Sequence, residues 1–89
     1  MARQQQQDLL ALGQAVRELR VQSHRSVRNL ATVCKVSAKS LAELEDGRLD
    51  PELELIAAIA RGIGVRPSEI YVRADELAAR EPRKQPRHA

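Results

Sequence analysis

The chain has 89 residues, which is enough for one domain and too few for two. It contains no Phe or Trp, one Tyr and one Cys, so its core must be aliphatic and no internal disulfide can form. No apolar run approaches the length of a membrane span and no signal-peptide pattern opens the chain, so we expect a soluble cytoplasmic protein.

The net charge of +3 is distributed unevenly along the sequence. Residues 1–40 carry seven Lys or Arg against two acids, residues 41–59 carry one against six, and residues 60–89 carry seven against four. Alternation of sign on this scale indicates a molecule with one basic side, which is typical of proteins that bind polyanions. It equally fits solvated helix surfaces, so a motif has to decide between the two interpretations.

The N-terminal part predicts an arm followed by a helix. Residues 1–8 are rich in Gln and lack apolar periodicity, so they are predicted to form a flexible arm. Asp8 can cap a helix over residues 9–22. The apolar residues that recur there at helical spacing are Leu9, Leu12, Val16 and Leu19.

Two short helices are predicted next, separated by only three or four residues. Ser26 can cap the first and Ser37 the second, and Gly47 stands where a left-handed residue would end the second helix. In the helix that Ser37 caps, Ala38, Leu41 and Leu44 fall on one face. So short a connection makes two helices cross steeply, as in the helix-turn-helix unit that places its second helix in the major groove of DNA.

Two further helices and a basic tail complete the chain. Pro51 suits the first turn of a fourth helix and Pro67 that of a fifth, because the missing amide hydrogen of proline has no helical partner there. Residues 81–89, with three Lys or Arg and two prolines, are predicted to be disordered. The predicted fold class is therefore all-α, a compact bundle of five helices over residues 9–80.

Landmarks from Leu12 to Ile70 keep the spacing of a known family. They are Leu12-Gly13, Val16-Arg17, Leu19-Arg20, Ser26, Leu30-Ala31, Val36-Ser37, Leu41, Leu44-Glu45, Gly47, Pro51, Ile59-Ala60, Ile63-Gly64-Val65 and Pro67-Ser68-Glu69-Ile70. Over about 59 of 89 residues this string resembles the Cro/CI-repressor (Xre) helix-turn-helix family. The resemblance implies a lambda-repressor-like domain that binds double-stranded DNA.

The resemblance also implies which residues would contact the bases. The base-reading positions of the family fall on Ser37, Ala38, Lys39, Ser40 and Glu43. Lys39 can donate to O6 or N7 of guanine, Ala38 can meet a thymine methyl group, and Glu43 can accept from N4 of cytosine. Ser40 can donate or accept, so it discriminates little. The alternative for Lys39 and Glu43 is an exposed ion pair at helical i, i+4 spacing.

Basic residues on both sides of this recognition helix would hold the phosphates. They are Arg25, Arg28, Lys35 and Arg48. Arg20 and Glu45 match positions that pair in the family as a largely buried ion pair between the first and third helices. The alternative for these two residues is a pair of exposed charges on separate helices.

Three positions depart from the family pattern. Val27 replaces a Gln that commonly reaches the phosphate backbone from the start of the second helix, and Val27 cannot do so. Lys35 replaces the glycine of the turn. If Lys35 adopts a positive φ, the strain of its backbone lowers the stability of the fold by about 1 kcal/mol relative to glycine. His24 stands where glycine is frequent. These changes leave the fold intact and affect the usual docking contacts.

The leading hypothesis is a transcriptional regulator, and the resemblance implies a repressor. Because one such domain reads too few base pairs for genomic specificity, we expect a homodimer that binds an inverted-repeat operator. The predicted dimer interface lies on the fifth helix and comprises Ile70, Tyr71, Ala74 and Leu77. One alternative is an antitoxin that binds its operator and a toxin. Another is a degenerate helix-turn-helix that serves only as a protein-interaction module for a regulator.

No enzyme, cofactor or metal site is predicted. His24 and His88 lack a nucleophile or a metal partner, and no Gly-rich phosphate loop occurs in the sequence. The single Cys34 is expected to act as a small buried apolar residue, ahead of any redox role.

Overall fold

The computed structural model describes residues 2–80 and the side chains of residues 6–80, so the predicted tail at 81–89 lies outside the described residues. The helices are α1 (Ala2–Gln22), α2 (Val27–Cys34), α3 (Ala38–Glu45), α4 (Leu53–Ile63) and α5 (Pro67–Arg80). No strand occurs between residues 2 and 80, and the all-α prediction is confirmed. None of the five helices combines the length and the apolar character that a membrane span requires.

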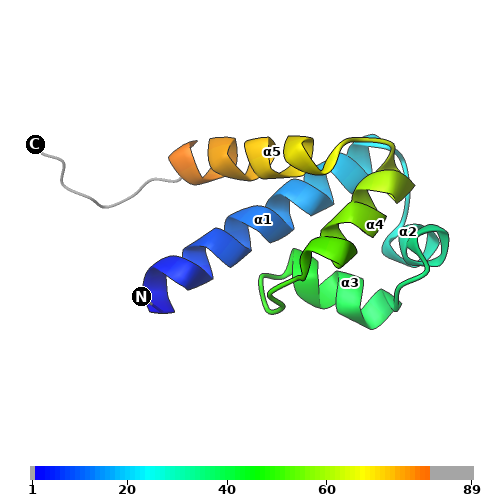
Figure 1. Ribbon diagram of the computed structural model, residues 1–89, viewed down its shortest axis with the longest axis horizontal. Helices are drawn as coiled ribbons and strands as arrows, with labels where there is room; N and C mark the ends of the chain where they lie inside the picture. Colours follow the sequence, from blue (N-terminus) through cyan, green and yellow to red (C-terminus); the bar gives the residue numbers. More distant parts are fainter. Residues whose placement is uncertain (1, 81–89) are drawn as a thin grey trace, which may run out of the picture.

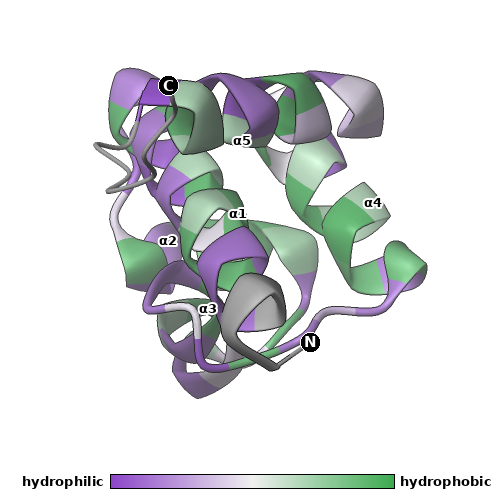
Figure 2. Ribbon diagram, turned by 90° about the vertical axis from the view of Figure 1, so that its left-hand side faces the viewer, coloured by the Kyte–Doolittle hydropathy of each residue, from purple (hydrophilic) through white to green (hydrophobic). Residues whose placement is uncertain are grey.

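The long helix α1 organises the molecule. It packs against α5 on one side and against α3 on the other, while α2 packs against α3 and α4 near the C-terminal end of α1 (Figure 1). The helix-turn-helix pair, α2 and α3, therefore lies on the part of the molecule remote from α5. In Figure 2, α4 is coloured as hydrophobic over most of its length, as expected of a helix that packs between α2 and α5.

The core is aliphatic, as predicted, and draws on all five helices. Its largest fully buried side chains are Val16, Leu30, Leu41, Leu44, Ile56, Ile59 and Ile70. Burial of a side chain of this size contributes roughly 1.5–3 kcal/mol relative to exposure. Because α2 and α3 are only eight residues long, their stability comes from this packing and from their caps rather than from helix propensity.

The helix α1 begins earlier than predicted. It starts at Ala2, so residues 2–8 are helical and Asp8 lies inside the helix rather than at its cap. The prediction of an arm followed by a helix from residue 9 is wrong on this point, because it weighed apolar periodicity alone. Ala, Arg and Gln have good helix propensity, and lengthening an existing helix needs no new nucleus.

Of the two prolines predicted to lie in the first turn of a helix, one does so and the other does not. Pro67 is the first residue of α5, as predicted. Pro51 lies before α4, whose first backbone hydrogen bonds run from the amides of Leu55 and Ile56 to the carbonyl of Glu52. Glu52 is therefore the N-cap residue, and the prediction that Pro51 lies in the first turn of the helix is wrong by two positions.

A close approach of two backbones fixes α3 against α1. A Cβ atom at Gly13 would overlap the carbonyl oxygen of Leu44 and would lie 2.7 Å from that of Glu45. Both carbonyls belong to the last residues of α3. Only glycine permits this separation, so Gly13 sets how near the C-terminal end of α3 comes to α1.

Candidate nucleic-acid interface

The helix α3 is held by its cap and by two leucines. Ser37 has extended backbone angles (φ −77°, ψ 145°) and its Oγ accepts a hydrogen bond of 2.9 Å from the amide of Ser40. Leu41 and Leu44 are fully buried, so one side of the helix is fixed to the core. The opposite side remains available to a ligand.

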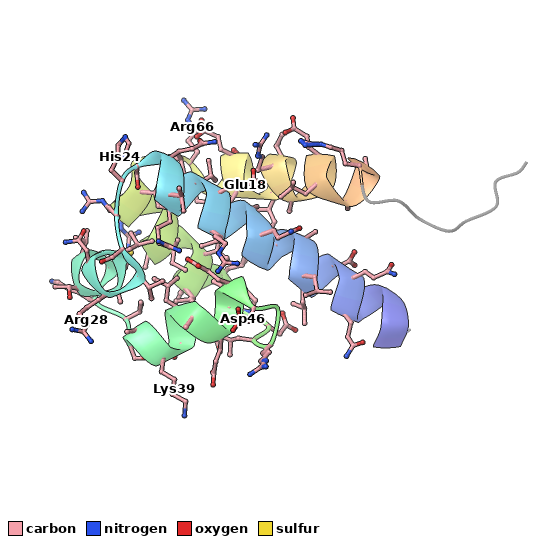
Figure 3. The ribbon with its side chains drawn as sticks, turned by 180° about the vertical axis from the view of Figure 1, so that it is seen from behind. Glu18, His24, Arg28, Lys39, Asp46 and Arg66 are labelled. Carbon is pink, nitrogen blue, oxygen red and sulfur yellow. The ribbon has the colours of Figure 1, made fainter. Side chains whose placement is uncertain are left out.

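The predicted base-reading residues lie on this available side. Ser37, Ala38 and Lys39 are exposed, and Ser40 and Glu43 are half-buried. Figure 3 shows Lys39 projecting from α3 on the side of the molecule away from α5, with Arg28 of α2 projecting from the neighbouring helix. Lys39, Ser40 and Glu43 are one, three and four positions apart, so these three residues share one helix face and can enter a single groove together.

A buried ion pair joins α3 to α1. The carboxylate of Glu45 has an exposed fraction of only 3%, and it accepts hydrogen bonds of 2.7 Å from Nε and 3.1 Å from Nη2 of Arg20. Arg17 Nε lies 3.8 Å from the same carboxylate. Nη1 of Arg20 donates to the carbonyl oxygen of Arg25 at 2.8 Å, so one guanidinium links the end of α3 to the turn before α2. Such a pair fixes orientation better than it adds net stability.

Left-handed backbone occurs at both positions where the family often has glycine. His24 has φ 61° and Lys35 has φ 62°, and Lys35 ends α2. The amide of Lys35 donates to the carbonyl of Thr32 and that of Val36 to the carbonyl of Ala31, which closes the turn between the two helices. The replacement of glycine by lysine therefore keeps the turn geometry at a cost of about 1 kcal/mol and adds an exposed cation beside α3.

The predicted phosphate contacts fall into two groups. Arg28, Lys35 and Arg48 are exposed. Arg25 is half-buried, and its Nη1 donates to Oδ1 of Asn29 at 2.7 Å, so its side chain is held along α2. The sequence analysis missed this contact, although the i, i+4 spacing of the two residues could have indicated it.

The charge of the interface changes sign along α3. Cations lie on α2 and in the turn before α3, whereas the loop after α3 and the start of α4 carry exposed acids. These acids are Asp46, Asp50, Glu52 and Glu54. Arg48 lies among them, and its amide donates to the carbonyl of Glu43 at 2.9 Å. A phosphate backbone is therefore attracted to the α2 side of the recognition helix and repelled from the side of the α3–α4 loop.

Residues 11–70 match the model of a family described as a helix-turn-helix domain. This chain belongs to that helix-turn-helix family. The predicted resemblance to the Cro/CI-repressor (Xre) proteins is thereby confirmed.

Two solved helix-turn-helix proteins resemble the chain in structure. The crystal structure of the clp gene regulator ClgR from Corynebacterium glutamicum is 31% identical with a TM-score of 0.80, and the match covers 83% of this chain and 79% of that one. The restriction-modification controller protein C.AhdI from Aeromonas hydrophila is 28% identical with a TM-score of 0.70, over 71% of this chain and 96% of that one.

Curated relatives give the same family. The transcriptional regulator ClgR of Mycobacterium tuberculosis, from strains CDC 1551 / Oshkosh and H37Rv, is 32% identical over 72 residues. These residues are 81% of this helix-turn-helix chain and 64% of ClgR. The chain thus matches slightly less than two thirds of the length of these relatives.

The predicted dimer interface on α5 is wrong for two of its four residues. Ile70 is fully buried and Ala74 is buried in the same core, so these two residues face the interior of the helix-turn-helix domain. Leu77 is half-buried and packs against that core. Tyr71 alone of the four is exposed, at 38%. The prediction failed because α5 packs along α1, which uses the apolar face that had been assigned to a second copy.

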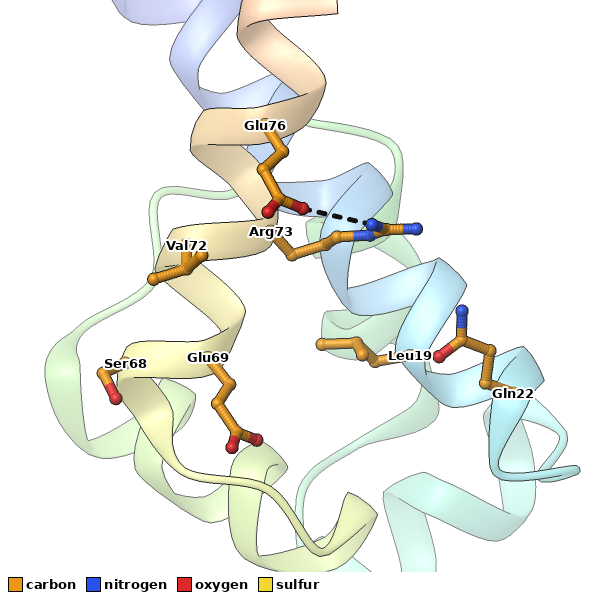
Figure 4. A pocket seen from close by; sticks show the side chains of 7 residues that line it. All are labelled: Leu19, Gln22, Ser68, Glu69, Val72, Arg73 and Glu76. Carbon is orange, nitrogen blue, oxygen red and sulfur yellow. Dashed lines mark hydrogen bonds and ion pairs between the residues drawn. The ribbon is translucent and has the colours of Figure 1, made fainter.

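A shallow groove of about 290 Å³ lies between α1 and α5. Its lining residues are Leu19, Gln22, Ser68, Glu69, Val72, Arg73 and Glu76 (Figure 4). Arg73 bonds Glu18 at 2.6 Å and Glu76 at 3.1 Å, and these carboxylates raise the pKa of the guanidinium. None of the predicted DNA contacts lines this groove, so it is separate from the candidate interface.

The cysteine lies at the far end of α2. Burial raises the pKa of the Cys34 thiol from its ordinary value of 9.0, and this effect outweighs the opposing influence of a hydrogen bond to Gly62 and of Arg25 and Arg61. Cys34 packs against the core but is half-buried rather than buried as predicted. Because the thiolate is the reactive form, a raised pKa fits the predicted role of a small apolar residue.

Proposed function

We propose that this helix-turn-helix protein is a sequence-specific regulator of transcription that binds a short inverted-repeat operator in double-stranded DNA. The exposed side of α3 carries the proposal, because Ser37 caps this helix, Leu41 and Leu44 fix it to the core, and Lys39 projects from it. The similarity to ClgR, which is itself described as a transcriptional regulator, supports the same function. Bound over a promoter, a protein of this kind would exclude polymerase and act as a repressor.

Within this proposal each exposed residue of α3 contacts a different base. Lys39 donates to guanine, Ala38 contacts a thymine methyl group, and Glu43 accepts from cytosine. Arg28 and Lys35, which are exposed beside α3, bind phosphates and set the register of the domain on the duplex. Arg48 does the same from the loop after α3, where the surrounding acids weaken its contribution.

A homodimer is part of the proposal, because a single domain reads too few base pairs. The inner face of α5 is occupied, so we assign the contact between copies to the start of α4. Leu53 there has an exposed fraction of 76%, the highest among the large exposed aliphatic residues of the described chain, and Leu49 and Leu55 beside it are half-buried. A two-fold contact across this surface would relate two recognition helices by the same symmetry as the two halves of an inverted repeat.

Selection of binding sites from random duplexes tests the proposal. We expect the wild-type protein to enrich an inverted repeat and Lys39→Ala to lose preference at one position in each half-site. Arg66→Ala is the matched control, because Arg66 is an exposed cation on the side of α5 (Figure 3), and it should leave the enriched sequence unchanged. If the wild-type protein enriches no sequence, the protein-interaction module becomes the better interpretation.

A further inference from the structure

Two hydroxyl groups at the start of α3 are coupled. Oγ of Ser37 accepts the amide hydrogen of Ser40 at 2.9 Å, and the two hydroxyl oxygens, Oγ of Ser37 and Oγ of Ser40, lie within hydrogen-bond distance of each other, also at 2.9 Å. Ser37 is exposed and Ser40 is half-buried, on the side of α3 that faces away from the core. The cap residue and a candidate base-reading residue are therefore joined by two hydrogen bonds.

One of the two hydroxyl protons of this pair is used between Ser37 and Ser40, and the other is left without a partner in the pair. An oxygen that already accepts a hydrogen bond becomes a better donor, so Ser37, which accepts the Ser40 amide, is the natural donor between the two hydroxyls. Ser40 then accepts from Ser37 and keeps its own proton. That proton is the part of Ser40 that still needs a partner.

We propose that Ser37 fixes Ser40 as a hydrogen-bond donor toward DNA, so that Ser40 selects a base that presents an acceptor in the major groove. This inference rests on the proposed function. An unpaired proton in a groove emptied of water is costly, whereas an oxygen that already accepts one hydrogen bond tolerates an unused lone pair. Guanine offers O6 and N7, adenine offers N7 and thymine offers O4, whereas cytosine offers only the N4 donor. Ser40 therefore disfavours cytosine at the base it faces, although a serine side chain alone could accept from it.

Ser37→Asp separates this role from capping. Aspartate is as good an N-cap as serine, so α3 keeps its start. Its carboxylate has no proton to give, and it would accept the proton of Ser40 as well as the amide hydrogen. Ser40 would then present only lone pairs to DNA. We expect the preference at this one base to change toward cytosine, whose N4 amino group donates, by about three- to tenfold, the effect of one hydrogen bond.

The experiment compares four proteins in selections from random duplexes. Ser37→Thr keeps both the cap and the donor, so it should give the wild-type sequence. Ser40→Ala should abolish preference at a single position, and Ser37→Asp should change preference at that same position. The added negative charge lowers binding to every duplex alike, so the readout is relative preference. Thermal unfolding should show that all four proteins are folded at the temperature of the selection.

The outcomes separate this inference from the proposed function. If the wild-type protein enriches a sequence but Ser40→Ala changes no position, Ser40 does not read a base and the inference is overturned. If Ser40→Ala abolishes preference at one base while Ser37→Asp leaves it as in wild type, Ser37 does not set the direction of the bond, and the inference is again overturned. If no protein enriches any sequence, the proposed function itself fails.

Discussion

Arg20, the third last residue of α1, and Glu45, the last residue of α3, lie 25 residues apart in sequence and are joined by two hydrogen bonds. The carboxylate is almost completely buried, and both of its hydrogen bonds from side chains come from this guanidinium. The same guanidinium also bonds the turn that precedes α2. The angle at which the recognition helix leaves the core is therefore tied to a single side chain of α1.

Arg20→Ala should lower the free energy of unfolding by roughly 3–5 kcal/mol, because the buried Glu45 carboxylate loses the donor of both hydrogen bonds and keeps only the exposed Arg17 at 3.8 Å. Arg20→Met combined with Glu45→Leu fills a similar volume without charge, and we expect it to regain most of this loss. Urea unfolding measures both effects. A double variant as unstable as Arg20→Ala would show that the pair contributes net stability. If the double variant is instead stable, its affinity for DNA relative to the wild-type protein reports what the ion pair contributes to the orientation of α3.

The helices α2 and α4 pack closely at Gly62, where the side chain of Cys34 leaves no room for a Cβ atom. A Cβ atom at Gly62 would overlap Sγ of Cys34 and would lie 3.1 Å from Cδ1 of Leu30. Gly62→Ala should therefore destabilise the wild-type protein by about 1–3 kcal/mol, despite the better helix propensity of alanine. In a Cys34→Ala background the sulfur is gone, and the same substitution should be neutral or stabilising. In this double-mutant cycle, urea unfolding of the wild type, the two single variants and the double variant gives the coupling free energy between positions 34 and 62. If the two substitutions have additive effects on the free energy of unfolding, the contact is contradicted.

At Gly13 the neighbours are backbone oxygens, so no side-chain substitution can make room for alanine. For this reason Gly13→Ala serves as the control for that cycle. It should remain destabilising in every background, Cys34→Ala included, because α1 would have to move away from the end of α3.

The proposed contact between copies predicts the effect of one exposed residue. Leu53→Ser should weaken self-association at least about tenfold, because burial of each leucine contributes roughly 1.5–3 kcal/mol and a two-fold interface buries two. Val21→Ser is the matched control, since Val21 is 56% exposed but lies on α1. Sedimentation equilibrium measures both. Because Asp50, Glu52 and Glu54 surround the leucine in sequence, added salt should strengthen the association. A dimer unaffected by Leu53→Ser would have its interface elsewhere.

Arg28→Ala tests the assignment of phosphate contacts. It should weaken binding to all duplexes alike and reduce the slope of log K against log salt by about 0.9 per protomer, hence by about 1.8 for a dimer. The enriched sequence should not change, because phosphate contacts carry no base information. Fluorescence anisotropy over a range of salt concentrations gives the slope. An unchanged slope would remove Arg28 from the interface.

The caps and turns of this domain could be predicted from the sequence because their causes are local. Ser26 and Ser37 cap helices through their own side chains, and Gly47 adopts the left-handed backbone expected of it. The recognition face followed from the same reasoning, since Leu41 and Leu44 leave only one side of α3 available. Spacing within a few residues was sufficient for each of these features.

Features that depend on a distant partner could not be predicted in this way. The apolar side of α5, with Ile70 and Ala74, suits a second copy as well as it suits α1, and only the packing of the whole chain decides between them. The contact of Arg25 with Asn29 and the coupling of Ser37 with Ser40 were within reach of spacing rules. Their chemical consequence, however, depends on which atom donates, and a sequence does not specify that.

The reversal of charge along the recognition surface has a consequence for the kinetics of association. Cations on α2 and in the turn at Lys35 face acids at Asp46 and beyond, so the surface carries a dipole roughly along its own plane. In the field of a duplex such a dipole experiences a torque before any contact forms, and the α2 end arrives first. Most misdirected encounters would then be corrected by rotation during diffusion rather than by dissociation, and this advantage would disappear as salt shortens the range of the field.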